Sequence, residues 1–306
     1  MHSVQRVHAL HSMRKSRSTN EPFIGVLYKK ESSLRVLILV LATVLSVGLK
    51  ANTPYEIPRS AVVELKESSS GRVYPIFIQV PVSYAKDPTQ KYPVIYLTDA
   101  HYSFPIVAGA TRFPMNSGVM EHAIIVAISY SKGSKGPSSR IRDFTPTKAT
   151  GWKYETGNAA GHANFIRTVV FPYVEQHYRT SKKERTFVGN SLGGLLGAHI
   201  LFTQPDMFSS YILGSPSVWF NDNFILSAPA KLPTKPVKVY LSVGELETPS
   251  HGERQDMVSG AHALKDKIIK LENSNIELLF SIVPSATHAT AFPTTAIQGL
   301  HWIYGI

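Results

Sequence analysis

Two kinds of hydrophobic pattern alternate along the chain, and their order predicts strands and helices in turn. Residues 61–67 and 73–80 alternate apolar and polar side chains on either side of a Ser-Ser-Ser-Gly turn, which is typical of an antiparallel hairpin. Continuous apolar runs, which indicate buried parallel strands, lie at 93–97, 123–128, 186–188, 211–213, 237–243 and 277–283. Helical spacing of apolar residues is found at 163–178, 195–202, 261–271 and 296–304.

This alternation predicts an α/β fold for residues 52–306, which we expect to form a single domain. Strands joined through helices give right-handed crossovers, and therefore a mostly parallel central sheet with helices on both faces. The opening hairpin is expected to form an antiparallel edge. In sheets of this kind the ligand site lies at the carboxyl ends of the strands, so the residues that follow each strand are the first candidates for function.

Residues 1–51 follow a different pattern and are interpreted as an N-terminal extension. Residues 34–49 form an apolar segment preceded by several Lys and Arg, which predicts a secretory signal peptide and a periplasmic or secreted protein. The segment is shorter than the roughly 20 residues of a membrane-spanning helix. Because residues 49–51 match a cleavage site poorly, an uncleaved inner-membrane anchor is the alternative. Because the basic segment before residue 34 is long, a later start of translation, for example at Met13, is a further alternative.

Composition excludes several classes of function. The chain has no cysteine, so a disulfide framework, a thiolate metal site and a Cys nucleophile are excluded. More than half of the net charge of +11 lies in residues 1–50, and no nucleic-acid-binding motif accompanies the remainder. We expect no nucleic-acid partner, metal or cofactor, and contact with a membrane only if residues 34–49 are retained as an anchor.

The segment from Gly189 to Gly193 carries the strongest chemical signal. It matches the G-x-S-x-G pattern with Ser191 at its centre, and it has a predicted strand before it and a predicted helix after it. That context is typical of a nucleophile elbow, a strained turn in which the neighbours of the serine must lack a Cβ. Ser191 is therefore the predicted nucleophile.

A serine nucleophile needs a base, and the base needs an orienting group. In this architecture the expected chain order is Ser, acid, His. His288 follows the last predicted strand and is the predicted base, whereas His301 lies on the predicted final helix. Glu247 and Glu245 both follow the preceding strand. We favour Glu247 as the acid, with Glu245 or a Ser–His dyad as the alternatives.

The developing negative charge on an ester needs two backbone N–H donors, which together form an oxyanion hole. One donor is expected from Leu192, the residue after the nucleophile. The other is expected from the loop 98–101, where Ala100 is favoured and His101 is second. Asp99 is interpreted as a residue that shapes this loop.

These residues form part of a longer resemblance to a known family, which covers nearly all of residues 60–304. The resemblance is carried by residues 92–99, 140–146, 171–178, 188–194, 215–220, 244–247 and His288. On these motifs the chain resembles the putative esterase family of α/β hydrolases, which includes esterase D and the siderophore esterases. Two departures are Ala100, where the family more often has Gly, and Asn190, where His is common.

The resemblance implies an α/β-hydrolase fold and a serine esterase that acts through an acyl-enzyme, with Ser191, Glu247 and His288 as its triad. It also implies a small-molecule carboxylic ester as substrate, including trilactone siderophores. Four residues are predicted to line the substrate site: His101, Arg140, Arg142 and Trp219. The two arginines, together with the loop lysines Lys132 and Lys135, are candidates to meet an anionic substrate; solvated loop charges are the alternative.

Two other functions remain open from the sequence. The same triad supports acyl transfer to an alcohol or hydrolysis of a thioester. A hydrolase fold without activity would instead serve as a binding module.

Overall fold

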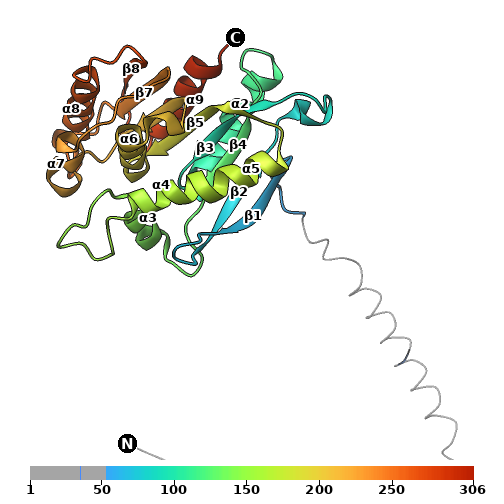
Figure 1. Ribbon diagram of the computed structural model, residues 1–306, viewed down its shortest axis with the longest axis horizontal. Coiled ribbons are helices and arrows are strands. Elements are labelled where there is room, and N and C mark those ends of the chain that lie inside the picture. Colours follow the sequence, from blue (N-terminus) through green and yellow to red (C-terminus); the bar gives the residue numbers. More distant parts are fainter. Residues whose placement is uncertain (1–34, 36–52) are drawn as a thin grey trace, which may run out of the picture. The chain divides into compact units, whose positions relative to one another are not determined.

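The computed structural model describes residue 35 and residues 53–306 (Figure 1). Apart from Arg35, the predicted signal or anchor segment 34–49 lies outside the described residues, and the domain boundary at residue 51 stays a prediction. Contacts group residues 56–306 into one compact unit, separate from residues 1–55. Within the described ranges, 35 and 53–306, we find no helix with the length and apolar character needed to cross a membrane.

An eight-stranded mixed sheet forms the centre of this unit, in the order β1-β2-β4-β3-β5-β6-β7-β8. Strand β2 pairs antiparallel with β1 and β4, and the remaining pairs are parallel. The predicted hairpin at the antiparallel edge and the mostly parallel sheet are therefore confirmed. The strands are β1 (Ser60–Lys66), β2 (Val73–Gln79), β3 (Tyr92–Leu97), β4 (Ile124–Ile128), β5 (Thr180–Asn190), β6 (Ser210–Gly214), β7 (Val237–Gly244) and β8 (Ile276–Val283).

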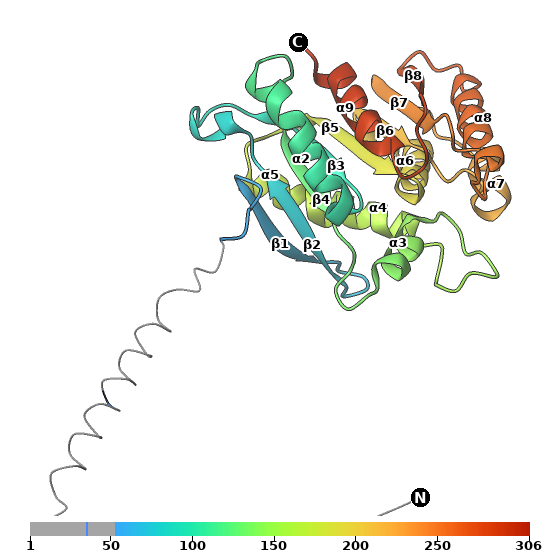
Figure 2. The ribbon, with the colours of Figure 1, turned by 180° about the vertical axis from the view of Figure 1, so that it is seen from behind.

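Helices cover both faces of the sheet. Helices α2 and α9 lie on one face, and α4, α5, α6 and α8 lie on the other (Figures 1 and 2). The helices are α2 (Ala100–Asn116), α3 (Gly136–Phe144), α4 (Ala159–Phe165), α5 (Phe171–His177), α6 (Leu192–Thr203), α7 (Phe220–Ser227), α8 (Met257–Ile269) and α9 (Ala291–Tyr304). A π-helical segment at Ile166–Val170 joins α4 to α5, so the predicted helix at 163–178 is continuous.

The two faces of the sheet build two separate apolar clusters. Successive strand residues point to opposite faces, so Phe187 joins the cluster beneath α6 while Val188 joins the cluster beneath α2 and α9. Both side chains are about 1% exposed. Because the second half of β5 is central and buried on both faces, its position fixes Ser191, the residue that immediately follows the strand.

Helices α2, α3 and α7 are absent from the sequence-based prediction. Helix α2 contains Pro105 and Pro114, and proline inside a helix normally indicates a break. Burial of the apolar residues Phe104, Val107 and Met115 against the sheet outweighs that local preference. The prediction of a loop at 98–101 is wrong for its second half, since Ala100 and His101 already form the first turn of α2.

Candidate active site

Ser191 lies at a sharp turn between β5 and α6 and has a strained backbone, with φ 61° and ψ −118°. Its N–H donates to the carbonyl of Gly214 at the end of β6, at 2.9 Å. The turn leaves no room for a side chain at either of the two motif glycines. A Cβ on Gly189 would collide with the carbonyl of Gly193, and a Cβ on Gly193 would collide with the side chain of Thr98. The two glycines therefore permit the close approach of strand and helix.

The carboxylate of Glu247 lies against the imidazole of His288, with 2.6 Å between Oε2 and Nδ1. Glu247 is fully buried. Its other oxygen, Oε1, accepts hydrogen bonds from the Ser215 hydroxyl at 2.6 Å and from the Gly244 N–H at 2.7 Å. Because a buried carboxylate is tolerated only with such donors, these contacts hold Glu247 in one orientation and leave Oε2 for the histidine.

Glu245, the alternative acid, occupies a different position. Its carboxylate accepts a hydrogen bond from the N–H of Ser285 at 2.7 Å, in the loop that leads to His288. Backbone hydrogen bonds from Glu245 to Val283 and from Leu246 to Ala286 further join the loops after β7 and β8. Glu245 thus holds the loop that leads to His288, whereas Glu247 contacts the imidazole itself.

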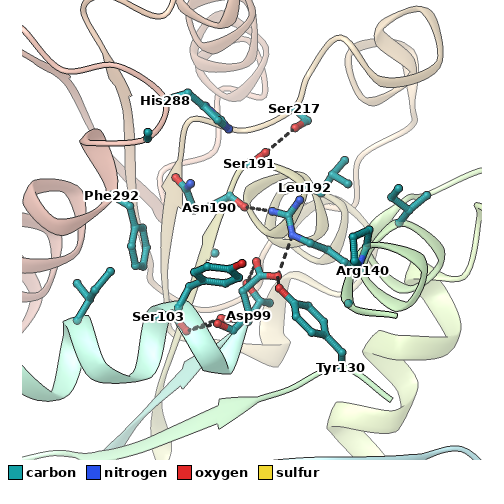
Figure 3. Close-up of a pocket in the computed structure, with 18 of the residues that line it drawn as sticks. Asp99, Ser103, Tyr130, Arg140, Asn190, Ser191, Leu192, Ser217, His288 and Phe292 are labelled. Atoms are coloured by element: carbon teal, nitrogen blue, oxygen red, sulfur yellow. Dashed lines mark hydrogen bonds and ion pairs between the residues drawn. The ribbon is translucent and has the colours of Figure 1, made fainter. Parts of the chain in front are cut away.

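Ser191 and His288 line the same cavity, which has a volume of about 610 Å³. The imidazole of His288 points toward Ser191 (Figure 3). No hydrogen bond joins the two residues, both of which belong to the described part of the chain. The Ser191 hydroxyl instead lies 3.3 Å from the Ser217 hydroxyl. Catalytic hydrogen bonds are often loose in an empty site and tighten when substrate binds.

The predicted oxyanion donors, Ala100 and Leu192, are the first residues of two helices that begin beside Ser191. The N–H groups in the first turn of a helix have no acceptor within the helix, and the helix dipole makes this end electropositive. Asp99, which precedes Ala100, is in the left-handed region with φ 56°. Leu192 and Asp99 line the cavity, so α6 begins at the cavity and α2 begins one residue after Asp99, an arrangement that suits a developing negative charge.

The four predicted substrate-binding residues divide into two pairs. Arg140 and Trp219 line the cavity. His101 does not, because its exposed ring packs edge-on against Phe77 at 5.2 Å between ring centroids. Arg142 also lies outside the cavity: its guanidinium is buried against Asp143, with which it forms bonds of 2.7 and 2.8 Å. The expectation that His101 and Arg142 contact substrate is thus not supported.

Arg140 is partnered by protein groups on the cavity wall. Its Nε donates to Asp99 Oδ1 at 2.8 Å, and its Nη2 donates to the carbonyl of Asn190 at 3.0 Å (Figure 3). The hydroxyl of Tyr130 donates to the same oxygen of Asp99 at 2.7 Å. Burial, followed by the charge of Asp99, raises the pKa of Tyr130 and keeps this hydroxyl protonated.

A second cavity of about 510 Å³ meets the first at the nucleophile. Four residues besides Ser191 line both: Trp152, Ser217, Trp219 and His288. The rings of Trp152 and Trp219 are nearly parallel, with an interplanar angle of 8° and 6.0 Å between centroids. Lys153 and Arg254 lie on the wall of the second cavity alone. The site is therefore a cleft with two compartments and Ser191 between them.

Several of these contact residues were not predicted from the sequence. They are Tyr130 and Trp152; the contacts of Ser215 with Glu247, of Ser217 with Ser191 and of Asp99 with Arg140 were also not predicted. All except Trp152 come shortly after a strand, at the edge where the site was expected. Strand position was therefore a usable signal for them, whereas their partners are decided by the three-dimensional arrangement of the loops.

Comparison with known proteins agrees with this geometry. The family model for putative esterases matches residues 68–288. The ferri-bacillibactin esterase BesA of Bacillus subtilis is 33% identical over 267 residues, which are 81% of this chain and 90% of that protein. The siderophore triacetylfusarinine C esterase of Aspergillus fumigatus is 34% identical over 191 residues, which are 60% of this chain and 65% of that protein.

A solved structure shares the fold as well. The crystal structure of the BES protein from Bacillus cereus superposes with a TM-score of 0.71 at 26% identity, covering 83% of this chain and 98% of that one. The family match spans the sheet from the hairpin turn to His288 and includes every residue of the proposed triad. The chain therefore belongs to the putative esterase family and is a serine ester hydrolase.

Proposed function

We propose that this protein hydrolyses a siderophore-type ester through an acyl-enzyme formed on Ser191. The observation that carries the proposal is the arrangement of Ser191 and His288 on one cavity, with the buried carboxylate of Glu247 bonded to the far side of the imidazole. This order of groups is the one that a serine nucleophile requires for activation.

In the proposed mechanism His288 takes the proton of the Ser191 hydroxyl as the oxygen attacks the ester carbonyl. The bond to Glu247 fixes Nδ1 as the protonated nitrogen, so Nε2 is free to act as the base, and the carboxylate stabilises the imidazolium that forms. The N–H groups of Ala100 and Leu192 are proposed to hold the oxyanion. His288 then returns the proton to the departing alcohol, and a water molecule releases the acid by the same steps in reverse.

The two-compartment cleft favours an ester with bulky groups on both sides of the scissile bond. A small acyl ester would fill neither compartment, because drug-sized ligands occupy cavities of about 300–1,000 Å³. The second compartment adds two exposed cations, Lys153 and Arg254, beside the flat indoles of Trp152 and Trp219. We propose that it receives the anionic or aromatic arm of the substrate.

The names of the relatives support the same substrate class. BesA is named a ferri-bacillibactin esterase, and the Aspergillus fumigatus enzyme is named a siderophore triacetylfusarinine C esterase. We infer that this chain acts on a multi-armed ester of the same general class. The iron in such a ligand would be part of the substrate rather than a resident cofactor.

The test is hydrolysis of a panel of esters by the wild type and by Ser191→Ala, with products identified by mass spectrometry. The panel holds short acyl esters, thioesters and ferric trilactone siderophores, with and without an added alcohol acceptor. We expect Ser191→Ala to lower kcat by about 10⁶-fold and the ferric trilactones to give the highest kcat/KM. Undiminished hydrolysis by the Ser191→Ala variant would exclude the mechanism, and an acylated acceptor would identify a transferase.

The paired variants Glu247→Gln and Glu245→Gln separate the triad from a dyad. Removing the charge next to His288 is expected to lower kcat by up to about 10⁴-fold. Glu245→Gln retains an acceptor for the Ser285 N–H and is expected to keep kcat within a few-fold. Equal, small losses in both variants would favour the Ser–His dyad.

We also propose that the protein is exported, to the periplasm or beyond, or is held at the inner membrane by an uncleaved segment. The support is the basic-then-apolar order of residues 1–51. Fractionation of cells with N-terminal sequencing of the product tests this. A full-length chain in the cytosolic fraction would contradict it.

A further inference from the structure

Arg140 bridges the two chain segments that carry the proposed oxyanion donors. Its Nε bonds to Asp99, directly before Ala100, and its Nη2 bonds to the carbonyl of Asn190, directly before Ser191 (Figure 3). One planar guanidinium therefore joins the start of α2 to the start of α6. The planar fork of arginine, with its several fixed donors, suits such a double contact.

The carbonyl that Arg140 holds belongs to the peptide bond between Asn190 and Ser191. The N–H of the same peptide bond donates to the carbonyl of Gly214 at 2.9 Å. Both polar ends of this peptide are thus fixed, by different elements. Since the orientation of this peptide sets φ of Ser191, the two contacts hold the strained 61° value that presents the hydroxyl to the cavity.

Asp99, the other residue that Arg140 contacts, is also held by hydrogen bonds in a strained backbone conformation. Its backbone has φ 56° and ψ 49°, a left-handed conformation that favours glycine over residues with a side chain. The Asp99 carboxylate is anchored by both Arg140 and Tyr130, and only 11% of its side chain is exposed. These bonds hold the turn that precedes Ala100, the residue proposed to donate its N–H to the oxyanion.

The same contacts argue against Arg140 as a ligand for an anionic substrate. The charge of Asp99 at 2.8 Å offsets that of the guanidinium, and two of its nitrogens already have protein acceptors. Lys153 and Arg254 have no carboxylate partner among the described residues and lie in the second compartment. Arg140 lines the cavity but has little free charge to offer it.

We propose that Arg140 is a positioning residue: through Asp99 and the Asn190 carbonyl it sets the distance between the two helix N-termini that form the oxyanion hole. This inference rests on the proposed esterase function. It assigns to Arg140 an effect on kcat that does not depend on the charge of the substrate.

The experiment compares two p-nitrophenyl esters with the same leaving group, the neutral butyrate and the anionic hemisuccinate. Arg140→Gln is expected to lower kcat by about 10²-fold for both esters, as the loss of one oxyanion donor does, with KM changed less than threefold. Arg140→Lys is expected not to restore kcat, because a single ammonium cannot bridge Asp99 and Asn190. Arg167→Gln, which removes an exposed hydrogen bond to Asn164 and makes the same substitution outside both cavities, is the matched control and should leave both constants unchanged.

The opposite pattern would overturn the proposal. A loss confined to KM for the anionic ester, weakened by salt and rescued by Arg140→Lys, would make Arg140 a substrate ligand. If Arg140→Gln lowers the melting temperature too far for assay, Tyr130→Phe loses one bond to Asp99 and should lower kcat three- to tenfold for both esters. If the wild type hydrolyses neither ester and does not react with a fluorophosphonate, the proposed esterase function is contradicted. If the wild type is active and Arg140→Gln has the same kcat as the wild type, only this inference is contradicted.

Discussion

Helix α3 carries two arginines that look equivalent in the sequence but form ion pairs with different aspartates in the structure. Arg140 faces the cavity and pairs with Asp99, which is 41 residues away in the chain. Arg142, two positions later, faces inward and pairs with its own neighbour Asp143. The spacing explains the difference, because residues two apart on a helix lie on nearly opposite sides.

The two pairs are built from the same kinds of group. Each aspartate also accepts a bond from a tyrosine hydroxyl: Tyr130 on Asp99 at 2.7 Å, and Tyr74 on Asp143 at 3.0 Å. The cavity pair touches the backbone of the nucleophile elbow. The inner pair touches side chains of β2, α3 and the segment after β4, and its loss reaches Ser191 only through the stability of the fold. Position decides which free energy, of activation or of unfolding, each pair affects.

The largest expected effect comes from breaking the inner pair. Arg142→Leu leaves the carboxylate of Asp143, of which 2% of the side chain is exposed, without its main partner. Burial would raise the pKa of Asp143, but the groups around it, including Arg142, lower it, so the removal of Arg142 is costly. We expect a loss of about 3–5 kcal/mol in the free energy of unfolding, measured by urea denaturation, with kcat of the folded fraction unchanged.

The double variant Arg142→Met/Asp143→Leu is the control for this prediction. It removes both charges and fills the space with apolar atoms, so it should be more stable than Arg142→Leu alone. If the double variant loses as much unfolding free energy as Arg142→Met and Asp143→Leu lose in sum, the pair is not the source of the effect.

The two tyrosines give a milder and better matched comparison. Tyr74→Phe removes a bond to a buried carboxylate and should cost about 1.5 kcal/mol of unfolding free energy, with kcat unchanged. Tyr130→Phe removes the equivalent bond at the cavity and should lower kcat while changing the unfolding free energy by less than Tyr74→Phe does. Urea titration and steady-state kinetics on both variants test this. If the two variants exchange these effects, the division between the pairs is wrong.

The sequence predicted the parts of the molecule that depend on short-range pattern. All eight strands were expected, because apolar runs and the hairpin alternation report directly on burial in a sheet. The elbow was predictable since G-x-S-x-G depends on local backbone geometry. The structure places His288 and Glu247 as the chain order predicted, at the ends of adjacent parallel strands.

What the sequence did not predict depends on contacts between distant segments. Helix α2 was missed because its prolines oppose a helix locally, and only the sheet beneath it stabilises it. Arg140 and Arg142 were given one role because nothing in the local pattern shows which side of α3 faces the cavity. The bond from Ser215 to Glu247 was missed because it joins the segments after β6 and β7, which are 32 residues apart in the chain.

The smallest predicted effect concerns His162, which packs beside the inner pair against the rings of Tyr74, Phe144 and Phe165. Neither ring nitrogen has a hydrogen-bond partner in the described structure. Burial lowers the pKa of His162 below its usual 6.5, although the charges of Asp143 and Glu67 oppose this. Below pH 6.5 the unfolded chain therefore binds a proton that the folded chain does not, so stability falls as the pH falls.

This contribution is at most about 1.4 kcal/mol per pH unit and ends at the folded-state pKa. His162→Phe, which fits the same aromatic surroundings, should make the unfolding free energy less dependent on pH between 6.5 and 5. His177→Phe on the exposed side of α5 is the control, measured by the same urea titrations. An unchanged pH dependence in His162→Phe would mean that the inner region tolerates a charged imidazole. The inner and cavity regions would then differ less in their electrostatics than their geometry indicates.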